Sequence, residues 1–278
     1  MNFFSQNSIK EELERHNFRP KKKFGQNFLI DRNITDIIIN TLDIKESDVI
    51  VEIGSGLGTL THLVAIKAKK LIAMETDTKL LDISKNLLST YNNIEFINKD
   101  ILKTSFNISE NYKVIGNIPY YITTPIILFL LDIIPRPEFF VLTIQKEVAQ
   151  RLMAKPGSKA YGSLSIFIQY RCKVEIVKYI KKTSFYPKPD VYSALVKFTF
   201  LEKPPVKLKN EKLFFDIIRA GFMYRRKMLI NAISRYANLG INREEIEKAF
   251  KHLNLSTSIR AESLSMSELA DLSNHIKR

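Results

Sequence analysis

The sequence of 278 residues contains a single cysteine, Cys172, and only four histidines, at positions 16, 62, 252 and 275. One cysteine excludes an internal disulfide and a cysteine-cluster metal site, and a buried, inert thiol is the ordinary state of such a residue. The histidines are scattered without the spacing of metal ligands. We therefore expect a protein without a metal site.

Long hydrophobic runs are also missing. The most apolar stretch, ITTPIILFLLDII (122–134), is shorter than the roughly 18 residues that a membrane span needs, and it contains Asp132. The first residues, MNFFSQNSIKEELERHNF, carry Glu11, Glu12 and Glu14 and have no apolar core of an export signal. These features predict a cytoplasmic protein without a membrane partner.

Acidic residues are few relative to basic ones. The chain has 43 Lys and Arg against 29 Asp and Glu, a formal net charge of +14, and a pI near 9.6. The basic residues cluster in 15–23, 178–188 and 225–227. This excess indicates a polyanionic partner, and nucleic acid before a membrane because the chain shows no basic amphipathic anchor. The alternative is a lysine-favouring composition that produces solvated basic faces.

Short apolar runs alternate with helical patterns from about residue 48 to residue 145. The predicted strands are 48–54, 70–75, 94–100, 112–117 and 138–145. Near-continuous apolar strands alternating with helices predict a doubly wound α/β fold with a parallel sheet covered on both faces. Residues 164–200 contain β-rich runs, and we expect antiparallel strands there that complete the sheet.

A proline- and lysine-rich stretch, EKPPVKLKN (202–210), predicts a linker between two domains. Beyond it the apolar spacing becomes helical, over 212–237, 243–254 and 265–277. We therefore expect an α/β domain over residues 1–203, with 1–20 as an N-terminal extension, and a small all-α domain over 204–278.

Glycines and carboxylates follow the first three predicted strands, at the edge where parallel strands present their carboxyl ends. Gly54 and Gly56 follow the first strand, and Glu75 and Asp100 end the second and third. Glycine lets the backbone approach a ligand, and carboxylates at these places can accept from ribose hydroxyls and from an adenine amino group. A nucleoside cofactor explains the whole set. Taken singly, these residues also suit a tight turn, a surface carboxylate and a helix cap.

The fourth strand ends in Asn117-Ile118-Pro119-Tyr120, which suits methyl transfer to an adenine amine. The amine lone pair is delocalised into the ring, and two acceptors, the Asn117 side-chain oxygen and the Ile118 carbonyl, could bind its N–H groups and direct that lone pair at a methyl donor. Pro119 makes the turn rigid. Tyr120 could stack on a flipped-out base, and Phe185 of the loop FYPKPD could stack on its other face. The alternatives are an Asn-Pro turn with a core tyrosine, and an ordinary exposed loop.

These motifs make the sequence similar to the ribosomal RNA adenine N6,N6-dimethyltransferases, specifically the KsgA-type small-subunit enzymes. The resemblance covers the chain from about residue 20 to its end, in the stretches 21–31, 51–61, 73–77, 98–102, 116–126, 185–193, 222–233 and 259–269. It implies a Rossmann-like class I methyltransferase that uses S-adenosylmethionine. The implied reaction dimethylates N6 of two adjacent adenosines in a hairpin near the 3′ end of small-subunit (16S) rRNA, with a role in small-subunit biogenesis.

The resemblance also implies roles for individual residues. The implied cofactor-binding residues are Gln26, Asn27, Leu29, Gly54, Gly56, Glu75, Asp100 and Asn117. The residues expected at the target base are Asn117, Pro119, Tyr120 and Phe185. The residues expected to contact RNA are Lys21, Lys22, Lys23, Lys188, Arg225, Arg226 and Lys227. We expect a monomer whose partner is small-subunit rRNA or a pre-small-subunit particle.

Ile118 stands where the small-subunit enzymes usually have leucine, and Asn-Ile-Pro-Tyr also occurs in the large-subunit (23S) methylases that confer macrolide resistance. Those enzymes tend to lack stretches like 222–233 and 259–269, so the small-subunit function is favoured. A DNA adenine methylase fits less well, because such enzymes generally have Asn/Asp-Pro-Pro-Tyr and a DNA-reading domain. A non-catalytic ribosome-assembly factor is the alternative from another class, and the intact set of site residues argues against it.

Overall fold

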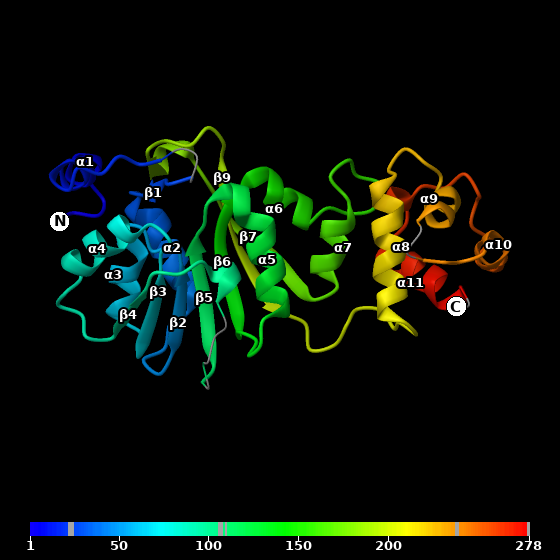
Figure 1. Cartoon of the computed structure of the whole chain (residues 1–278), viewed down its shortest axis with the longest axis horizontal. Coiled ribbons are helices and arrows are strands. Elements are labelled where there is room, and N and C mark those ends of the chain that lie inside the picture. The colour runs from blue at the N-terminus through cyan, green and yellow to red at the C-terminus, as the bar shows by residue number, and fades with distance from the viewer. Residues whose placement is uncertain (22–24, 105–107, 109, 237–238, 277–278) are drawn as a thin grey trace. The chain divides into compact units, whose positions relative to one another are not determined.

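A seven-stranded sheet, in the order β4-β3-β2-β5-β6-β9-β7, forms the centre of the first unit (Figure 1). The structure is a computed structural model that describes residues 1–21, 25–104, 108, 110–236 and 239–276. The five strands predicted between residues 48 and 145 are β2 Val49–Ile53, β3 Lys70–Met74, β4 Ile94–Ile97, β5 Tyr112–Asn117 and β6 Phe139–Gln145. They pair in parallel, whereas β9 (Ser193–Phe200) runs antiparallel to β6. The doubly wound α/β fold is therefore confirmed.

The strand order reverses between β2 and β5. From β2 the chain adds β3 and β4 on one side, and β5 and β6 then extend the sheet on the other. The register pairs Ile53 with Gly116, so Gly54 and Asn117 follow side by side at the carboxyl edge. In open α/β sheets this reversal point is where ligands bind.

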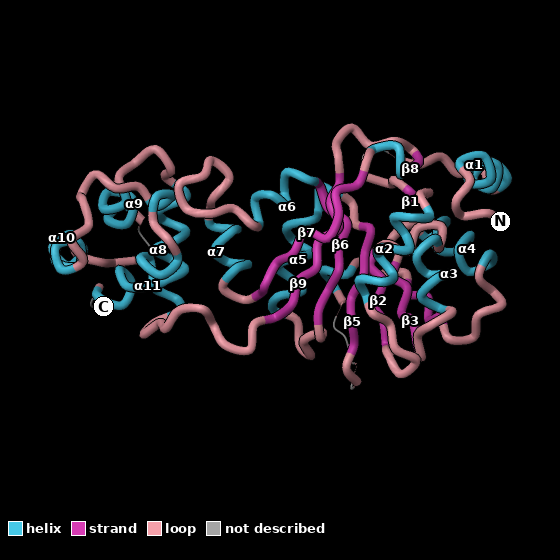
Figure 2. Tube along the Cα trace, turned by 180° about the vertical axis from the view of Figure 1, so that it is seen from behind, coloured by secondary structure: helices cyan, strands magenta, loops and turns pink. Residues whose placement is uncertain are grey.

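Helices cover both faces of the sheet (Figures 1 and 2). On one face α2 (Arg32–Leu42) and α3 (Thr59–Ala65) bury their apolar side chains against β2, β3, β5 and β6. On the other face lies α5 (Thr123–Asp132). Because both faces are covered, β2 is buried along its whole length, and all of its residues except Glu52 are apolar.

The N-terminal residues belong to this unit. Helix α1 (Gln6–Arg15) packs Ile9 and Leu13 into a cluster with Leu57 of the glycine loop. Strand β1 (Phe28–Leu29) then pairs antiparallel with β8 (Phe185–Tyr186) in a separate two-stranded sheet. The sequence did not predict this pairing, which joins the N-terminal segment to the loop FYPKPD.

The expectation of strands across residues 164–200 is wrong for its first part. Residues Ser163–Gln169 form helix α7, which follows α6 (Lys146–Leu152), and β7 (Cys172–Ile180) and β9 come after it. Ile166 and Tyr170, one helical turn apart, pack into the core of the second unit. This tertiary packing overrides the β propensity of the isoleucines around them.

The second unit is helical and comprises Gln150–Lys173 and Leu201–Arg278. The expected division at residue 203 placed 150–173 in the first domain, whereas in the structure Ile166 and Tyr170 share a core with Phe214 and Phe215. The helices after the linker are α8 Glu211–Met223, α9 Leu229–Arg235, α10 Arg243–His252 and α11 Met266–His275.

The helical pattern of 212–237 is interrupted between α8 and α9. There the backbone N–H of Lys227 donates to the carbonyl of Tyr224 at 2.7 Å, and that of Leu229 donates to the carbonyl of Ile259 at 2.7 Å. A turn and a long-range hydrogen bond thus replace helical bonds, so the basic residues 225–227 lie in a loop.

Candidate active site

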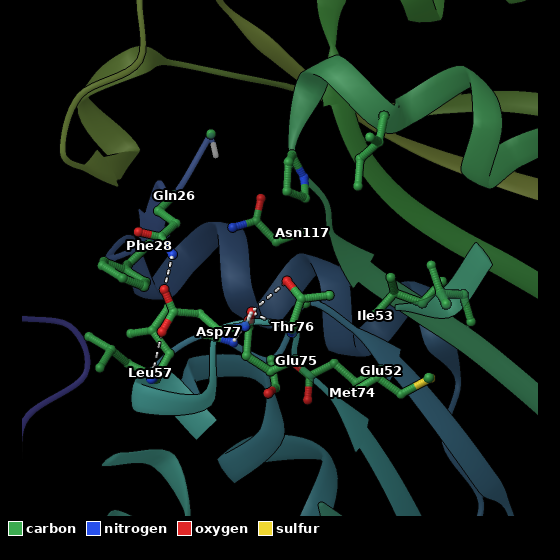
Figure 3. Close-up of a pocket in the computed structure, with 18 of the residues that line it drawn as sticks. Gln26, Phe28, Glu52, Ile53, Leu57, Met74, Glu75, Thr76, Asp77 and Asn117 are labelled. Atoms are coloured by element: carbon green, nitrogen blue, oxygen red, sulfur yellow. Dashed lines mark hydrogen bonds between the residues drawn. The ribbon is translucent and has the colours of Figure 1, made fainter. Parts of the chain in front are cut away.

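A cavity of about 770 Å³ opens at the carboxyl ends of β2, β3, β4 and β5 (Figure 3). All eight residues predicted to bind the cofactor line it: Gln26, Asn27, Leu29, Gly54, Gly56, Glu75, Asp100 and Asn117. They come from five separate segments of the chain. The structure thus brings the predicted residues together, and their individual roles remain predictions.

The loop between β2 and α3 depends on glycine for its conformation. Gly54, Gly56 and Gly58 have φ angles of 75°, 56° and 95°, in the left-handed region that favours glycine. A Cβ on Gly56 would lie 3.3 Å from the Phe28 ring, and one on Gly58 would lie 2.7 Å from Leu88 Cδ1. Gly58 was not among the predicted site residues, although it ends the same motif. The three glycines let the loop turn sharply from β2 into α3 at the cavity wall.

Glu75 holds the glycine loop from the end of β3. Its Oε2 accepts from the Gly56 N–H at 3.0 Å, and its Oε1 accepts from the N–H groups of Thr76 and Asp77 at 2.8 and 2.9 Å. Burial raises the pKa of this carboxyl, and the three backbone N–H groups oppose the rise. A carboxylate has about four lone-pair sites, so Oε2 can still accept from a ligand.

Asp77 is a cavity residue that the sequence did not single out. Its Oδ2 accepts from Lys21 Nζ and from Gln26 Nε2, both at 3.2 Å, while its Oδ1 caps helix α4 (Thr78–Leu87). Burial alone would raise the pKa of Asp77, but the Lys21 and Gln26 contacts outweigh it and lower that pKa. Lys21, predicted to contact RNA, therefore lies at the cofactor cavity. No local pattern indicates this contact, because it joins segments more than 50 positions apart.

Asp100 serves as a helix cap and also lines the cavity. Its Oδ1 accepts from the Leu102 N–H at 3.0 Å, at the start of the 3₁₀ turn η2 (Ile101–Lys103). The alternative role considered for Asp100, that of a helix cap, is therefore observed. Since the carboxyl also lies at the cavity wall, capping leaves the predicted contact with an adenine amino group possible.

Two buried polar atoms at the cavity wall, Glu52 Oε2 and Ser55 Oγ, have no hydrogen-bond partner among the described residues. Glu52 is 1% exposed, and burial raises its pKa to about 7. The Thr61 hydroxyl opposes this shift and the charge of Glu75 adds to it. Buried polar groups are usually paired, so these two atoms fit a ligand that carries donors.

Asn117 is held by the N-terminal segment. Its Nδ2 donates to the Asn27 carbonyl at 2.9 Å, and Figure 3 shows the amide nitrogen turned toward the Gln26–Phe28 segment. A Cβ on Gly25 would lie 3.2 Å from Pro119 Cβ, so this segment packs directly against the Asn-Ile-Pro-Tyr turn. Because the nitrogen is engaged, Oδ1 is the atom of the amide that is left as a hydrogen-bond acceptor.

Tyr120 and Tyr121 lie in different surroundings. The Tyr120 hydroxyl forms a 2.6 Å hydrogen bond with Ser193 Oγ, and its ring is half-buried. Burial raises the pKa of Tyr120, and the hydrogen bond with Ser193 opposes that rise. Tyr121, which was not predicted, lines the cavity and is 61% exposed.

The expected stacking role of Phe185 does not fit its position. Its side chain is 2% exposed and belongs to the apolar core of the first unit. The antiparallel pairing of β8 with β1 places Phe185 opposite Leu29, and this pairing buries the ring. In this arrangement Phe185 presents no ring face to a base.

The residues predicted to contact RNA differ in their surroundings. Lys188, Arg226 and Lys227 are exposed. Lys22 and Lys23 lie outside the described residues. The exposed side chains of Lys188, Arg226 and Lys227 are available to a polyanion.

Arg225 is engaged within the helical unit. Its Nη2 donates to the carbonyls of Lys159 and Tyr161, at 3.0 and 3.3 Å, and to Glu262 Oε2 at 3.0 Å. These contacts join three segments of that unit. Arg225 therefore holds this loop while remaining exposed, like Arg226 and Lys227, and its contact with RNA stays a prediction.

The remaining observations concern metals and membranes. Within the described ranges, no three His, Cys, Asp or Glu side chains are grouped to hold a metal ion. In the same ranges no helix is both long and apolar enough to cross a membrane. Cys172 is buried.

Comparisons with known proteins place this site in context. The model of the ribosomal RNA adenine dimethylase family matches residues 17–278. The chain is 41% identical over 275 residues to the ribosomal RNA small subunit methyltransferase A of Clostridium acetobutylicum, covering 98% of this chain and 99% of that one. It is 30% identical to a dimethyladenosine transferase from Plasmodium falciparum, whose crystal structure superposes with a TM-score of 0.76 over 88% of this chain and 95% of that one. The 23S rRNA methyltransferase ErmE, 23% identical, has the same fold with a TM-score of 0.71 over 90% and 99% of the two chains.

Proposed function

The chain belongs to the ribosomal RNA adenine dimethylase family, and from this membership we propose that it dimethylates N6 of two adjacent adenosines in small-subunit rRNA. The methyl donor is S-adenosylmethionine, and the target hairpin lies near the 3′ end of the RNA. Identity of 41% to a named small-subunit enzyme favours this substrate over the 23S RNA named for ErmE, at 23%.

The observation that carries the proposal is the convergence of Gly54, Glu75, Asp100 and Asn117 on one cavity at the strand reversal. Glu75 would accept the ribose hydroxyls of the cofactor, and Asp100 would accept its adenine amino group. The glycine loop would approach it through backbone atoms. S-adenosylmethionine, when bound, supplies a methyl group on a sulfonium centre.

Asn117 orients the target amine. Its Nδ2 is anchored on Asn27, so Oδ1 accepts one N–H of the adenine amine while the Ile118 carbonyl accepts the other. The two acceptors hold the nitrogen nearer tetrahedral geometry and direct its lone pair at the methyl group. The methyl group that S-adenosylmethionine would supply would pass from its sulfur to this nitrogen, and the amine proton would then leave to water. Positioning supplies most of this catalysis, because the amine proton becomes acidic only after transfer.

Tyr120 contributes a ring against which the extruded base stacks, held in place by Ser193. Lys188, Arg226 and Lys227 contact RNA phosphates. Since the substrate is ribosomal RNA, whether naked or in a particle, we place the reaction in the cytoplasm.

The test uses small subunits and naked 16S and 23S rRNA from a strain that lacks the dimethylation. The protein is incubated with each RNA and S-adenosylmethionine carrying a labelled methyl group, and the modified nucleosides are mapped. We expect dimethyladenosine at two adjacent positions of small-subunit RNA. Label in 23S rRNA would instead identify a large-subunit methylase, and cofactor binding without transfer to any of these RNAs would favour an assembly factor.

A further inference from the structure

Two half-exposed tyrosines of the first unit share a lysine ammonium outside the cavity. Tyr179, on β7, is 47% exposed, and Tyr192, just before β9, is 51% exposed. Lys146 Nζ lies 5.2 Å from the ring centre of Tyr179 and 5.9 Å from that of Tyr192. Lys182 Nζ lies 5.5 Å from the ring centre of Tyr192. We call Lys146, Tyr179, Lys182 and Tyr192 the tyrosine–lysine cluster.

The backbone holds this cluster in place. The Lys146 N–H donates to the Tyr192 carbonyl at 2.9 Å, which fixes the start of α6 against the start of β9. Lys182 Nζ donates to the Asp190 carbonyl. Tyr179 lies on the last strand in the sheet order, next to β9. The four side chains therefore come from anchored segments.

The cluster adjoins Ser193, the residue that bonds the Tyr120 hydroxyl. Ser193, whose Oγ binds the Tyr120 hydroxyl, follows Tyr192 in the chain, so their Cα atoms are about 3.8 Å apart. Ser193 also pairs with Gln145, the residue before Lys146. Thus Tyr192 directly precedes the residue that bonds the proposed base-stacking ring, and Lys146 directly follows the strand partner of that residue.

We propose that the tyrosine–lysine cluster binds an unpaired nucleotide of the RNA substrate that neighbours the target adenosine. This inference rests on the proposed function for the identity of the RNA. The exposed tyrosine rings stack on the base, and the lysines contact its phosphates, as in other sites for single-stranded nucleic acid. A single exposed tyrosine is common on protein surfaces and needs no explanation. Here one ammonium, that of Lys146, lies near both rings, so the two tyrosines form one exposed aromatic and cationic surface.

The surrounding charge favours an anionic chain. Lys178, Lys181 and Lys188 are exposed on the same stretch of sequence. In the sequence stretches 146–149 and 174–192, which carry the cluster, five lysines stand against three acidic residues, Glu147, Glu175 and Asp190. A nucleotide meets both requirements of the cluster, a flat ring and a negative charge.

The test measures binding of a fluorescent oligoribonucleotide with the sequence of the small-subunit 3′ hairpin, by anisotropy. We expect Tyr192→Leu and Tyr179→Leu each to weaken binding by at least about fivefold, the lower end of the effect of losing one stacked base. Tyr192→Phe, which keeps the ring, should bind within about twofold of the wild type. The KM for the RNA should rise in the leucine variants while kcat and the affinity for S-adenosylmethionine stay unchanged.

A charge-matched pair of variants tests the lysine contribution. Lys146→Gln should lower the slope of log affinity against log salt by about one. Lys67→Gln should leave the slope unchanged, because Lys67 is an exposed lysine before β3, four strands from β9 in the sheet order. Thermal unfolding of every variant separates loss of the ring or the charge from loss of the fold.

Wild-type affinity in both leucine variants, with their fold intact, would overturn the proposal. Loss of affinity for small subunits but not for the naked hairpin would also overturn it, by indicating contact with a ribosomal protein. If the wild type binds the hairpin but methylates no ribosomal RNA, the proposed function fails, and the affinity comparison still decides the cluster.

Discussion

The side-chain amide of Asn117 donates a 2.9 Å hydrogen bond to the backbone carbonyl of Asn27, 90 positions earlier in the chain. The bond decides which end of the amide is engaged: the nitrogen faces the N-terminal segment, and the oxygen is left as an acceptor. It also links the end of β5 to the N-terminal segment, and both line the cavity. Several consequences of this arrangement can be measured.

Asn117→Ala removes the side-chain acceptor that we propose for the target amine. We expect kcat for methyl transfer to fall by about 100-fold or more, as it does when a preorganised hydrogen-bonding group is lost elsewhere. Asn117→Asp should be similarly impaired, because its second carboxylate oxygen would face the Asn27 carbonyl without a proton between them. Single-turnover methyl transfer measures the effect, and RNA affinity should stay within about twofold. Near-normal turnover in both variants would remove Asn117 from the reaction.

Glu75→Gln should weaken cofactor binding. One glutamine oxygen cannot accept from Gly56 on one side and from Thr76 and Asp77 on the other, so the glycine loop loses part of its support. We expect the Kd for S-adenosylmethionine to rise by about 10- to 100-fold, the range for hydrogen bonds to charged groups. Calorimetric titration measures it. The matched control is Glu110→Gln, an exposed carboxylate paired with Lys69, which should bind the cofactor normally.

Glu52→Gln should change how stability depends on pH. The pKa of Glu52 is raised from 4.5 to about 7, so between those values the folded protein binds more protons at this site than the unfolded chain. Its contribution to stability is therefore complete below about pH 4.5 and is lost as pH rises through 7. The loss is on the order of 3 kcal/mol. The variant lacks this titration and should become more stable relative to the wild type between pH 5 and pH 8.

Urea unfolding of both proteins at pH 5 and at pH 8 measures the difference in their free energies of unfolding. The contributions of the other titrating groups cancel in this difference. Equal pH dependence in the wild type and in Glu52→Gln would show that this carboxyl titrates normally.

Gly116→Ala should disturb the strand that carries Asn117. A Cβ there would lie 2.8 Å from Ile118 Cγ2 and 2.9 Å from the Ile53 carbonyl oxygen, so β5 must shift away from β2. We expect a loss of about 1–3 kcal/mol in the free energy of unfolding, together with slower methyl transfer. Gly162→Ala is the control, because a Cβ at Gly162 meets nothing within 4 Å. Equal stability of the two variants would contradict the close packing of β5 on β2.

Features that depend on the local sequence pattern, such as the strands and the residues at their ends, could be predicted from the sequence. The central strands β2, β5 and β6 are largely apolar because they are buried on both faces, and the order of the five parallel strands along the chain places their ends at one edge. Gly54, Glu75, Asp100 and Asn117 each end or directly follow a strand, so their meeting at the cavity follows from the topology alone. These four positions could therefore be predicted without knowledge of side-chain packing.

The tertiary structure alone decided the features that depend on distant segments. Residues 163–169 are helical because Ile166 packs into the helical core, and Phe185 is buried because β8 pairs with β1. Lys21 reaches Asp77, and Arg225 reaches Glu262, through contacts that no local spacing encodes. The sequence determined which residues stand at the ends of the strands. Which of them face a ligand, and which support the fold, depended on the long-range pairing of the chain.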